Sequence, residues 1–362
     1  MTKKESNVLK GIAIMLMLWH HLFMYADTPG FPPLAYGPLL DSQRLAALGQ
    51  LSKLCVAIFV FVTAYGTAMS YRSDSMRDER ALMAKSLGRY IRLMISFQLV
   101  YIIAFLLCPL GGKSWLTLYS PSRLENLAFA FFDFMGLSYI LPSPSYNSAW
   151  WYMSLAVTLV LLLPWVIKLC RRFGWYLLLP ALLVVRWAQA EFVICRYLLL
   201  IVLGIVMADS GLWESLEARL KGRRLKKVLI SLAGLLVLGL CAVLWLRADD
   251  KLYDVYESAM VLALLPFALW GLGRVPLLGS ALAFLGRHSM NIFFFHAFIY
   301  QNWFGDFTYS LRYPLLIWGF LLLSSLAFSV LLEALKKPLH VPQLIDWLSG
   351  RANALLLPRE RA

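Results

Sequence analysis

Long apolar runs separated by short basic segments most constrain how this chain can fold. About ten such runs follow one another, at 8–25, 54–71, 93–109, 150–167, 175–190, 192–208, 228–246, 255–272, 285–303 and 313–335. A helix needs about 20 apolar residues to cross the hydrocarbon core of a bilayer. The pattern therefore predicts an all-α polytopic membrane bundle of about ten transmembrane helices. The shorter apolar run 128–141 is expected to be re-entrant or interfacial.

The composition supports this fold class and excludes others. Hydrophobic residues make up 60% of the 362 residues and charged residues only 15%, whereas a soluble domain is about half apolar and a quarter charged. A soluble enzyme, a disordered chain and a disulfide scaffold are therefore excluded. We expect one transmembrane domain, residues 1–340, followed by a short cytoplasmic tail, 341–362. The five cysteines show no CxxC or Cys/His spacing, so no metal site is expected.

The basic residues also predict an orientation. The chain has 34 Lys and Arg against 20 Asp and Glu, a net charge of +14. In a soluble protein this excess would suggest a nucleic-acid partner, but here the basic residues lie between apolar runs. Cytoplasmic loops of membrane proteins are enriched in Lys and Arg. Placing both termini in the cytoplasm puts most of the basic residues inside, and no nucleic-acid partner is expected.

Two adjacent histidines interrupt the first apolar run. Lys10 and His21 are eleven residues apart, so on a helix they lie within about 20° of each other and roughly 16 Å apart, whereas His20 points about 100° away. One interpretation is that Lys10 holds a phosphate of a donor molecule while His21 acts as general base toward an acceptor hydroxyl. The other is a structural histidine pair that is hydrogen-bonded to neighbouring helices.

Further polar and aromatic residues inside or beside the runs have two interpretations each. His296 is either a contact to donor or acceptor or a satisfied interhelical hydrogen bond. An aromatic cluster is either an interfacial belt or a platform for a sugar, and a charged corner is either an ion-pair staple or part of an acceptor site. The aromatic cluster is Trp150, Trp151 and Tyr152, and the charged corner is Arg186, Glu191 and Arg196. Asp133, in the short apolar run, is a conceivable partner for a histidine.

Several short blocks, in order along nearly the whole chain, resemble the acyltransferase-3 family of integral membrane O-acyltransferases. The first is the basic residue and histidine in LKGIAIMLMLWHHLF, with Lys10 where the family often has Arg. The second, FVFVTAYG at 59–66, resembles the family's FFxxSGY, with Thr63 and Ala64 replacing Ser and Gly. The others are the RxxR segment at Arg89 and Arg92 without its usual proline, WWYMS at 150–154 and GRHSMNIFFFHAF at 286–298.

The resemblance implies an enzyme that moves an acyl group, commonly acetyl from acetyl-CoA, to a sugar hydroxyl. The expected acceptor is a cell-surface or secreted polysaccharide, or its lipid-linked precursor, and the expected location is the bacterial cytoplasmic membrane. His21 would be catalytic, with His20 orienting its neighbour or the donor. Acyl-CoA would be bound by Lys10, Arg89, Arg92, Thr63 and Tyr65. A transporter or flippase of a lipid-linked sugar is the alternative, although the sequence lacks the related halves common in transporters.

Overall fold

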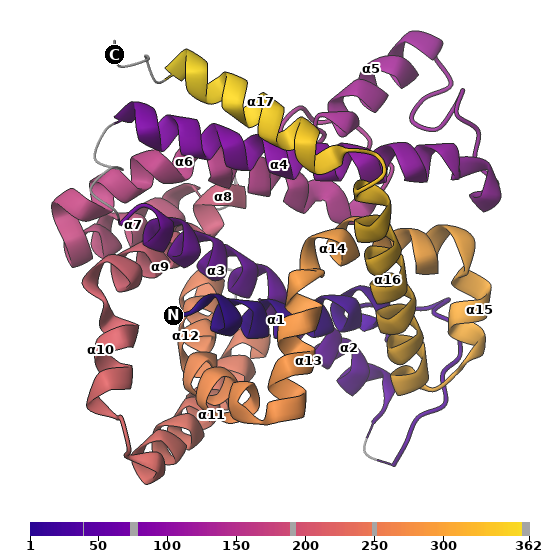
Figure 1. Ribbon diagram of the computed structural model, residues 1–362. Coiled ribbons are helices and arrows are strands. Elements are labelled where there is room, and N and C mark those ends of the chain that lie inside the picture. The colour runs from indigo at the N-terminus through magenta and orange to yellow at the C-terminus, as the bar shows by residue number, and fades with distance from the viewer. Residues whose placement is uncertain (39, 73–78, 189–192, 248–251, 357–362) are drawn as a thin grey trace. The chain divides into compact units, whose positions relative to one another are not determined.

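The computed structural model describes residues 1–38, 40–72, 79–188, 193–247 and 252–356, and the regular secondary structure within them is helical (Figure 1). The α-helices are α1 (Lys3–Phe23), α2 (Ser42–Leu51), α3 (Leu54–Ser70), α4 (Glu79–Leu106), α5 (Arg123–Phe134), α6 (Trp151–Phe173), α7 (Leu178–Ala188), α8 (Val193–Arg196), α9 (Leu198–Ser210), α10 (Leu212–Arg219), α11 (Arg224–Arg247), α12 (Tyr253–Pro266), α13 (Pro276–Arg287), α14 (Ser289–Ala297), α15 (Gly305–Ser310), α16 (Pro314–Lys336) and α17 (Val341–Leu356). Short 3-10 turns are η2 (Cys108–Gly111), η3 (Ser148–Trp150), η4 (Gly174–Leu177) and η7 (Leu272–Arg274), and π-helical turns are η6 (Phe267–Gly271) and η8 (Phe298–Trp303).

The chain divides into two compact units, each built from two stretches of sequence. The first unit comprises Met1–Arg72 and Trp165–Ser289, and the second comprises Ser73–Pro164 and Met290–Ala362. In the first unit α1 packs against α2, α3 and α13, while α11 packs along α12. In the second unit α17 packs along α4. The candidate residues therefore fall into two sets, which are described separately below.

The number of helices suited to crossing a membrane differs from the sequence prediction. Six described helices are long and apolar enough, or up to seven if the pair α9–α10, bent by 56°, is one span. The predicted run 8–25 forms α1, whose Lys10, His20 and His21 reduce its hydropathy, and it is not among the six. The run 285–303 is divided among α13, α14 and η8. The run 150–167 and the described part of the run 175–190 fall in one candidate of 41 residues, Ser148–Ala188, in which the η4 turn separates α6 from α7.

Helix α4 begins well before the predicted third run. It extends over 28 residues, about 42 Å, which exceeds the hydrocarbon thickness of about 30 Å. Arg89 and Arg92 therefore lie within the helix instead of preceding it. The segment 341–356, predicted to be part of a tail, forms α17 and lies along α4 (Figure 1). The extent of the 1–340 domain stays a prediction.

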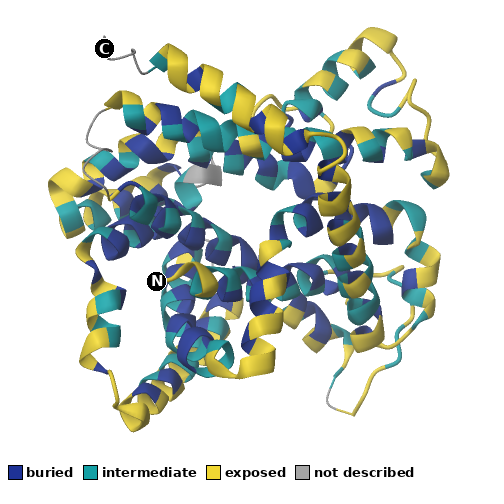
Figure 2. Cartoon of the chain, viewed as in Figure 1, coloured by how far each residue is buried: buried dark blue, intermediate teal, exposed yellow. Residues whose placement is uncertain are grey.

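Close backbone contacts made by glycines fix the position of α1 in the first unit. A Cβ on Gly11 would lie 2.1 Å from the Leu282 carbonyl oxygen of α13, and a Cβ on Gly286 would lie 1.9 Å from the carbonyl oxygen of Asn7. Only glycine permits such an approach between helices. Most of α1 is consequently buried or half-buried, and its ribbon in Figure 2 is accordingly dark blue and teal. The contact with α13 sets how deeply the lysine and histidines of α1 lie in the unit.

Candidate functional site

His20 ties the end of α1 to α2. Its Nδ1 lies 2.8 Å from the backbone oxygen of Gly49. A carbonyl oxygen can only accept a hydrogen bond, so this contact places a proton on Nδ1. A Cβ on Gly49 would lie 2.7 Å from the backbone nitrogen of Met24, so the same glycine allows α2 to approach this closely. His20 therefore joins two helices, as the structural interpretation of the histidine pair expected.

His21 is half-buried and lies directly beside His20. The two ring centroids are 5.1 Å apart, and the rings meet edge to face at 63°. Because His20 is held by Gly49, its ring gives His21 a fixed neighbour. This geometry agrees with His20 orienting its neighbour, while the catalytic role of either histidine stays a prediction.

Lys10 and His21 share one stripe of α1, as their spacing predicted, and that stripe is mostly buried. Ile14 and Met17 lie between them on the same stripe, and their exposed fractions are 0% and 3%. Lys10 and His21 are each half-buried, and so are Met15 and Trp19 on the opposite face of α1. Ionisable groups on the inward face of a membrane helix are costly and are commonly functional. The stripe is thus accessible at its two ends and packed in its middle.

The second motif places Thr63 and Tyr65 on α3 in the same unit. Tyr65 is buried, with 1% exposed, and its hydroxyl donates to Oε1 of Glu214 over 2.8 Å. Thr63 is half-buried, and its backbone oxygen accepts a hydrogen bond from the Thr67 hydroxyl at 2.6 Å. Tyr65 thus links α3 to α10 in this structure. Cofactor binding by either residue stays a prediction.

Arg89 and Arg92 lie on α4 in the second unit. Arg89 is half-buried and Arg92 is exposed. Residues three apart on a helix lie on neighbouring positions of one face, so both guanidinium groups project from the same side of α4. Arginine suits phosphate because its planar fork offers paired donors and keeps its charge. The structure therefore offers a basic face on α4, and its role in binding acyl-CoA stays a prediction.

The predicted aromatic platform is divided between core and half-buried positions. Trp150 is 1% exposed, and its indole Nε1 donates to the backbone oxygen of Phe294 at 3.0 Å. Its ring packs edge to face on Phe97 and Phe298. Trp150 is therefore a core residue of the second unit and presents no open face to a sugar. Trp151 and Tyr152 are half-buried, and their substrate contacts stay predictions.

His296 is fully buried in α14, with 0% exposed. Its Nδ1 lies 2.9 Å from the backbone oxygen of Phe293 and 3.1 Å from that of Ile292. The imidazole therefore donates to its own helix, where carbonyl oxygens accept. These bonds stay within α14 and do not join two helices, so they are not the interhelical hydrogen bond that the sequence left open, and a substrate contact stays a prediction.

The arginines of the charged corner form ion pairs with carboxylates that are distant in the sequence. Arg196 donates to Oε1 of Glu257 over 2.8 Å, and Arg186 forms an ion pair with Asp254. Both carboxylates lie on α12 and are nearly fully buried. Glu191 lies outside the described residues. Both arginines are in ion pairs, with carboxylates of α12 and not of the corner itself as the partners, and an acceptor site at this corner stays a prediction.

Asp133 has hydroxyl and backbone partners within its own unit. Its carboxylate accepts from the hydroxyls of Tyr119 and Ser145 and from the backbone N–H of Tyr146, each at 2.8 Å. Burial raises the pKa of the Asp133 carboxyl, and these three donors oppose that rise. Burial also raises the pKa of the Tyr119 hydroxyl. Asp133 therefore fastens the segment between α4 and α6, and none of its described hydrogen-bond partners is a histidine.

The sequence analysis missed the partners of these charged groups. Asp254 and Glu257 are three residues apart at the start of an apolar run, which is the signal that would have singled them out. Glu214 and Glu217, on α10, lie in a polar loop of the predicted topology and give no such signal. Among the described residues, no group of three or more His, Cys, Asp and Glu is placed to hold a metal ion.

The apolar helices define a multi-pass membrane protein, in which a half-buried histidine pair stands near the end of α1. The family model Acyl_transf_3, described as an acyltransferase domain, matches residues 3–334. The chain therefore belongs to the acyltransferase-3 family and is a membrane acyltransferase. No curated protein and no solved structure matches it.

Proposed function

We propose that this acyltransferase moves an acetyl or other short acyl group from cytoplasmic acyl-CoA to a hydroxyl of a cell-surface or secreted polysaccharide or its lipid-linked precursor, in the bacterial cytoplasmic membrane. The observation that supports this proposal is the half-buried His21 on an otherwise packed stripe of α1, with Lys10 at the other end. The family membership favours this chemistry over the alternative of a transporter or flippase. The proposal keeps the expected bundle of about ten spans with both termini cytoplasmic.

In the proposed reaction His21 removes the proton from the acceptor hydroxyl. The freed oxygen attacks the thioester carbonyl carbon, and the resulting tetrahedral oxyanion collapses with cleavage of the carbon–sulfur bond. The thiolate of coenzyme A then accepts this proton from the His21 imidazolium, which restores the neutral imidazole. General acid–base catalysis of this kind contributes about 10²- to 10⁴-fold to a rate. His20, which is held by Gly49, is assigned to positioning His21.

The basic groups at the predicted cytoplasmic edge are assigned to the phosphates of the donor. Lys10 and the arginines of α4, Arg89 and Arg92, supply this charge. The packing of Ile14 and Met17 between Lys10 and His21 means that the thioester arm reaches His21 beside that stripe, or after these two side chains move. Substituting Arg89 or Arg92 by Gln is expected to raise KM for acetyl-CoA and leave kcat nearly unchanged, because both act on binding.

The proposal is tested with membranes that contain the full chain, labelled acetyl-CoA and candidate polysaccharides. We expect label to enter a base-labile ester, and His21→Ala to lower this transfer about 10²- to 10⁴-fold. His340→Asn is the matched control, since His340 is an exposed histidine with φ of 53°, which asparagine tolerates. Full activity in His21→Ala, at normal expression, would rule out His21 as the base.

A further inference from the structure

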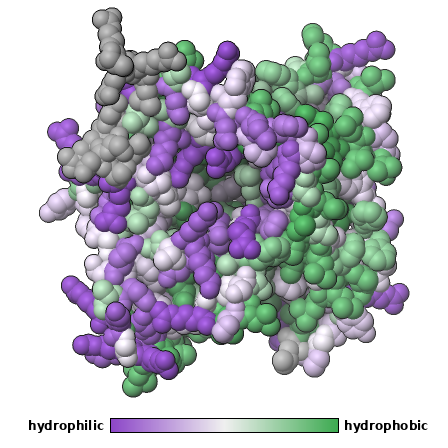
Figure 3. Space-filling model, in the orientation of Figure 1, coloured by the Kyte–Doolittle hydropathy of each residue, from purple (hydrophilic) through white to green (hydrophobic). Residues whose placement is uncertain are grey.

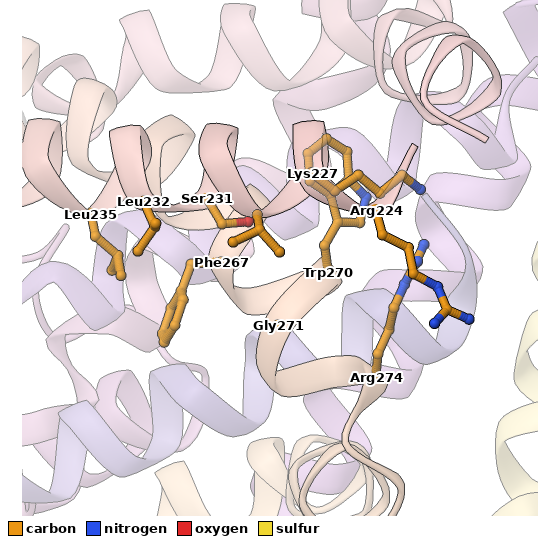
Figure 4. Close-up of a pocket in the computed structure, with 10 residues that line it drawn as sticks. Arg224, Lys227, Ser231, Leu232, Leu235, Phe267, Trp270, Gly271 and Arg274 are labelled. Atoms are coloured by element: carbon orange, nitrogen blue, oxygen red, sulfur yellow. The ribbon is translucent and has the colours of Figure 1, made fainter. Parts of the chain in front are cut away.

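A cavity of about 500 Å³ lies between α11 and the η6–η7 segment of the first unit. Its lining is divided by chemistry, as Figure 4 shows. Arg224, Lys227 and Arg274 gather at one end, while Leu232, Leu235 and Phe267 lie toward the other. A volume of this size falls within the range of about 300–1,000 Å³ that small-ligand sites occupy. The cavity is distinct from the histidines of α1 and takes no part in the proposed reaction.

The basic end holds more positive than negative charge. Oε1 of Glu217 accepts from Lys227 at 2.7 Å and from Arg274 at 2.5 Å. Arg224 forms no ion pair with any residue that the structure describes, so three cations face one carboxylate and two positive charges are in excess.

Two of the three cations at this end, Lys227 and Arg274, are held in place before any ligand arrives. Lys227 is buried, and its Nζ lies 5.1 Å from the centroid of the Trp270 ring. Trp270 in turn donates from Nε1 to Oε2 of Glu217 and stacks on Trp213 at 5.2 Å. Glu217 thus fixes Lys227, Arg274 and Trp270 together. A preorganised basic end binds an anion with little loss of side-chain freedom.

The N-terminal end of α11 lies at the basic end of the cavity and adds to its positive charge. The first turn of this helix contains Arg224, Lys226 and Lys227 and no acidic residue. The N-terminal end of a helix is itself positive, so cations are disfavoured there and anions are favoured. An anion at the basic end of the cavity would therefore relieve repulsion that the protein alone does not balance.

The position along the two helices indicates what kind of anion fits. Arg224–Arg247 and Tyr253–Arg274 are both candidate membrane spans, and the basic end of the cavity lies where one begins and the other finishes. Ends of spans lie at the level of lipid headgroups, and the apolar lining faces the depth of acyl chains. Hydrophilic side chains also gather where α10 leads into α11, at the lower left of Figure 3. Basic pockets between membrane helices bind anionic lipid headgroups.

We propose that this cavity binds one anionic phospholipid. Arg224, Lys227 and Arg274 hold its phosphate, and an acyl chain lies along Leu232, Leu235 and Phe267. Free phosphate would leave the apolar half unused, and a zwitterionic lipid would bring a second positive charge to an end that already has an excess. Acyl-CoA shares the combination of phosphate and chain, and the experiment below distinguishes it from the lipid.

The test uses the purified full chain in mild detergent and measures retained lipid by native mass spectrometry. Phosphatidylglycerol is compared with phosphatidylcholine of the same acyl chains, and we expect preferential retention of phosphatidylglycerol. Arg224→Gln should weaken its binding roughly fivefold, the effect of one basic residue near an anionic headgroup. Lys226→Gln is the matched control, because Lys226 is exposed on the same turn and does not line the cavity.

A second pair of variants tests the apolar half without changing charge. Leu232→Trp fills the lining and should reduce retention of phosphatidylglycerol, whereas Leu236→Trp, one turn further along, should not. Both leucines are exposed, at 52% and 76%, so neither change disturbs a core. Equal effects of the two substitutions within either pair, or equal retention of the two lipids, would overturn the proposal. Displacement of the lipid by millimolar inorganic phosphate or by acetyl-CoA would also overturn it, by identifying an anion or donor site instead.

Discussion

The helical segment that runs from α12 to η7 has a balance of positive and negative side chains at one end and an excess of positive ones at the other. Near its start, Asp254 and Glu257 each meet one arginine, Arg186 and Arg196. At its finish, Glu217 of α10 pairs with Lys227 and Arg274, and the exposed Arg224 adds a third cation to the same cavity. The first end is balanced pair by pair, and the second end has an excess of positive charge.

This difference separates charge that builds the fold from charge that is available to a ligand. A buried carboxylate is tolerated only when a partner offsets the lost hydration, which describes the nearly fully buried Glu257. Arg224 is exposed and keeps most of its hydration, with no ion pair to the residues that the structure describes. We therefore expect substitutions at the balanced end to affect stability, and substitutions at the basic end to affect binding.

The largest expected effect is the loss of one partner at the balanced end. Arg196→Met leaves the Glu257 carboxylate buried without its cation, and we expect the free energy of unfolding to fall by about 3–5 kcal/mol. Denaturant or thermal unfolding in detergent measures this loss. The double variant Arg196→Met with Glu257→Met should recover most of the loss, because no charge is then left buried. A double variant as unstable as the single one would show that the pair does not act as a unit.

Glu217→Gln should change both properties at once. It removes the carboxylate that accepts from Lys227 and Arg274, so we expect a loss of about 1–3 kcal/mol in stability. The same change adds to the positive excess and should tighten phosphatidylglycerol binding roughly fivefold. Added phosphatidylglycerol should then raise the unfolding temperature more in this variant than in the wild type. Phosphatidylcholine is the control lipid, and an equal rise with it would contradict the comparison.

A smaller effect of opposite sign is expected for Arg224→Gln without lipid. This change removes a cation from the positive end of α11, so the stability should increase by about 0.3–1 kcal/mol. The unfolding temperature in lipid-free detergent reports this gain in stability. Added phosphatidylglycerol should remove the difference between the variant and the wild type, because it supplies the wild type with an anion for Arg224. A loss of stability in lipid-free detergent would mean that Arg224 makes a stabilising contact of its own.

The smallest effect is the response of each end to salt. Raising ionic strength should weaken phosphatidylglycerol binding at the basic end, since exposed charges are screened, and should barely alter the stabilisation from the buried Arg196–Glu257 pair. Titrating phosphatidylglycerol at two salt concentrations measures the response of the basic end. The difference in stability between the wild type and Arg196→Met at the same two concentrations measures the response of the balanced end. Equal sensitivity at the two ends would remove the distinction between them.

The sequence predicted features that depend on local pattern. Hydropathy predicted helices and a membrane protein, and the spacing of Lys10 and His21 predicted that they share a stripe of α1. The number of candidate spans in the structure is smaller than the ten predicted. Lys10, His20 and His21 lower the hydropathy of α1, and the run 285–303 is divided among shorter helices.

Features that depend on distant pairing were not predictable in the same way. Arg196 lies 61 residues from Glu257, and a single sequence does not show which carboxylate an arginine will meet. Trp150 begins an apolar run, a position where a core tryptophan and an interfacial one look alike. The basic cavity is lined by α11, η6 and η7 and has no signature in any one of them.

The glycine contact between α1 and α13 has a mechanical consequence. Backbones that touch directly have no side chains between them to change rotamer, so neither helix has a second low-energy register on the other. Any rocking during turnover must carry α1 and α13 as one piece. In the proposed reaction, the imidazole of His21 therefore keeps a fixed position, and substrates of different length must adjust to it.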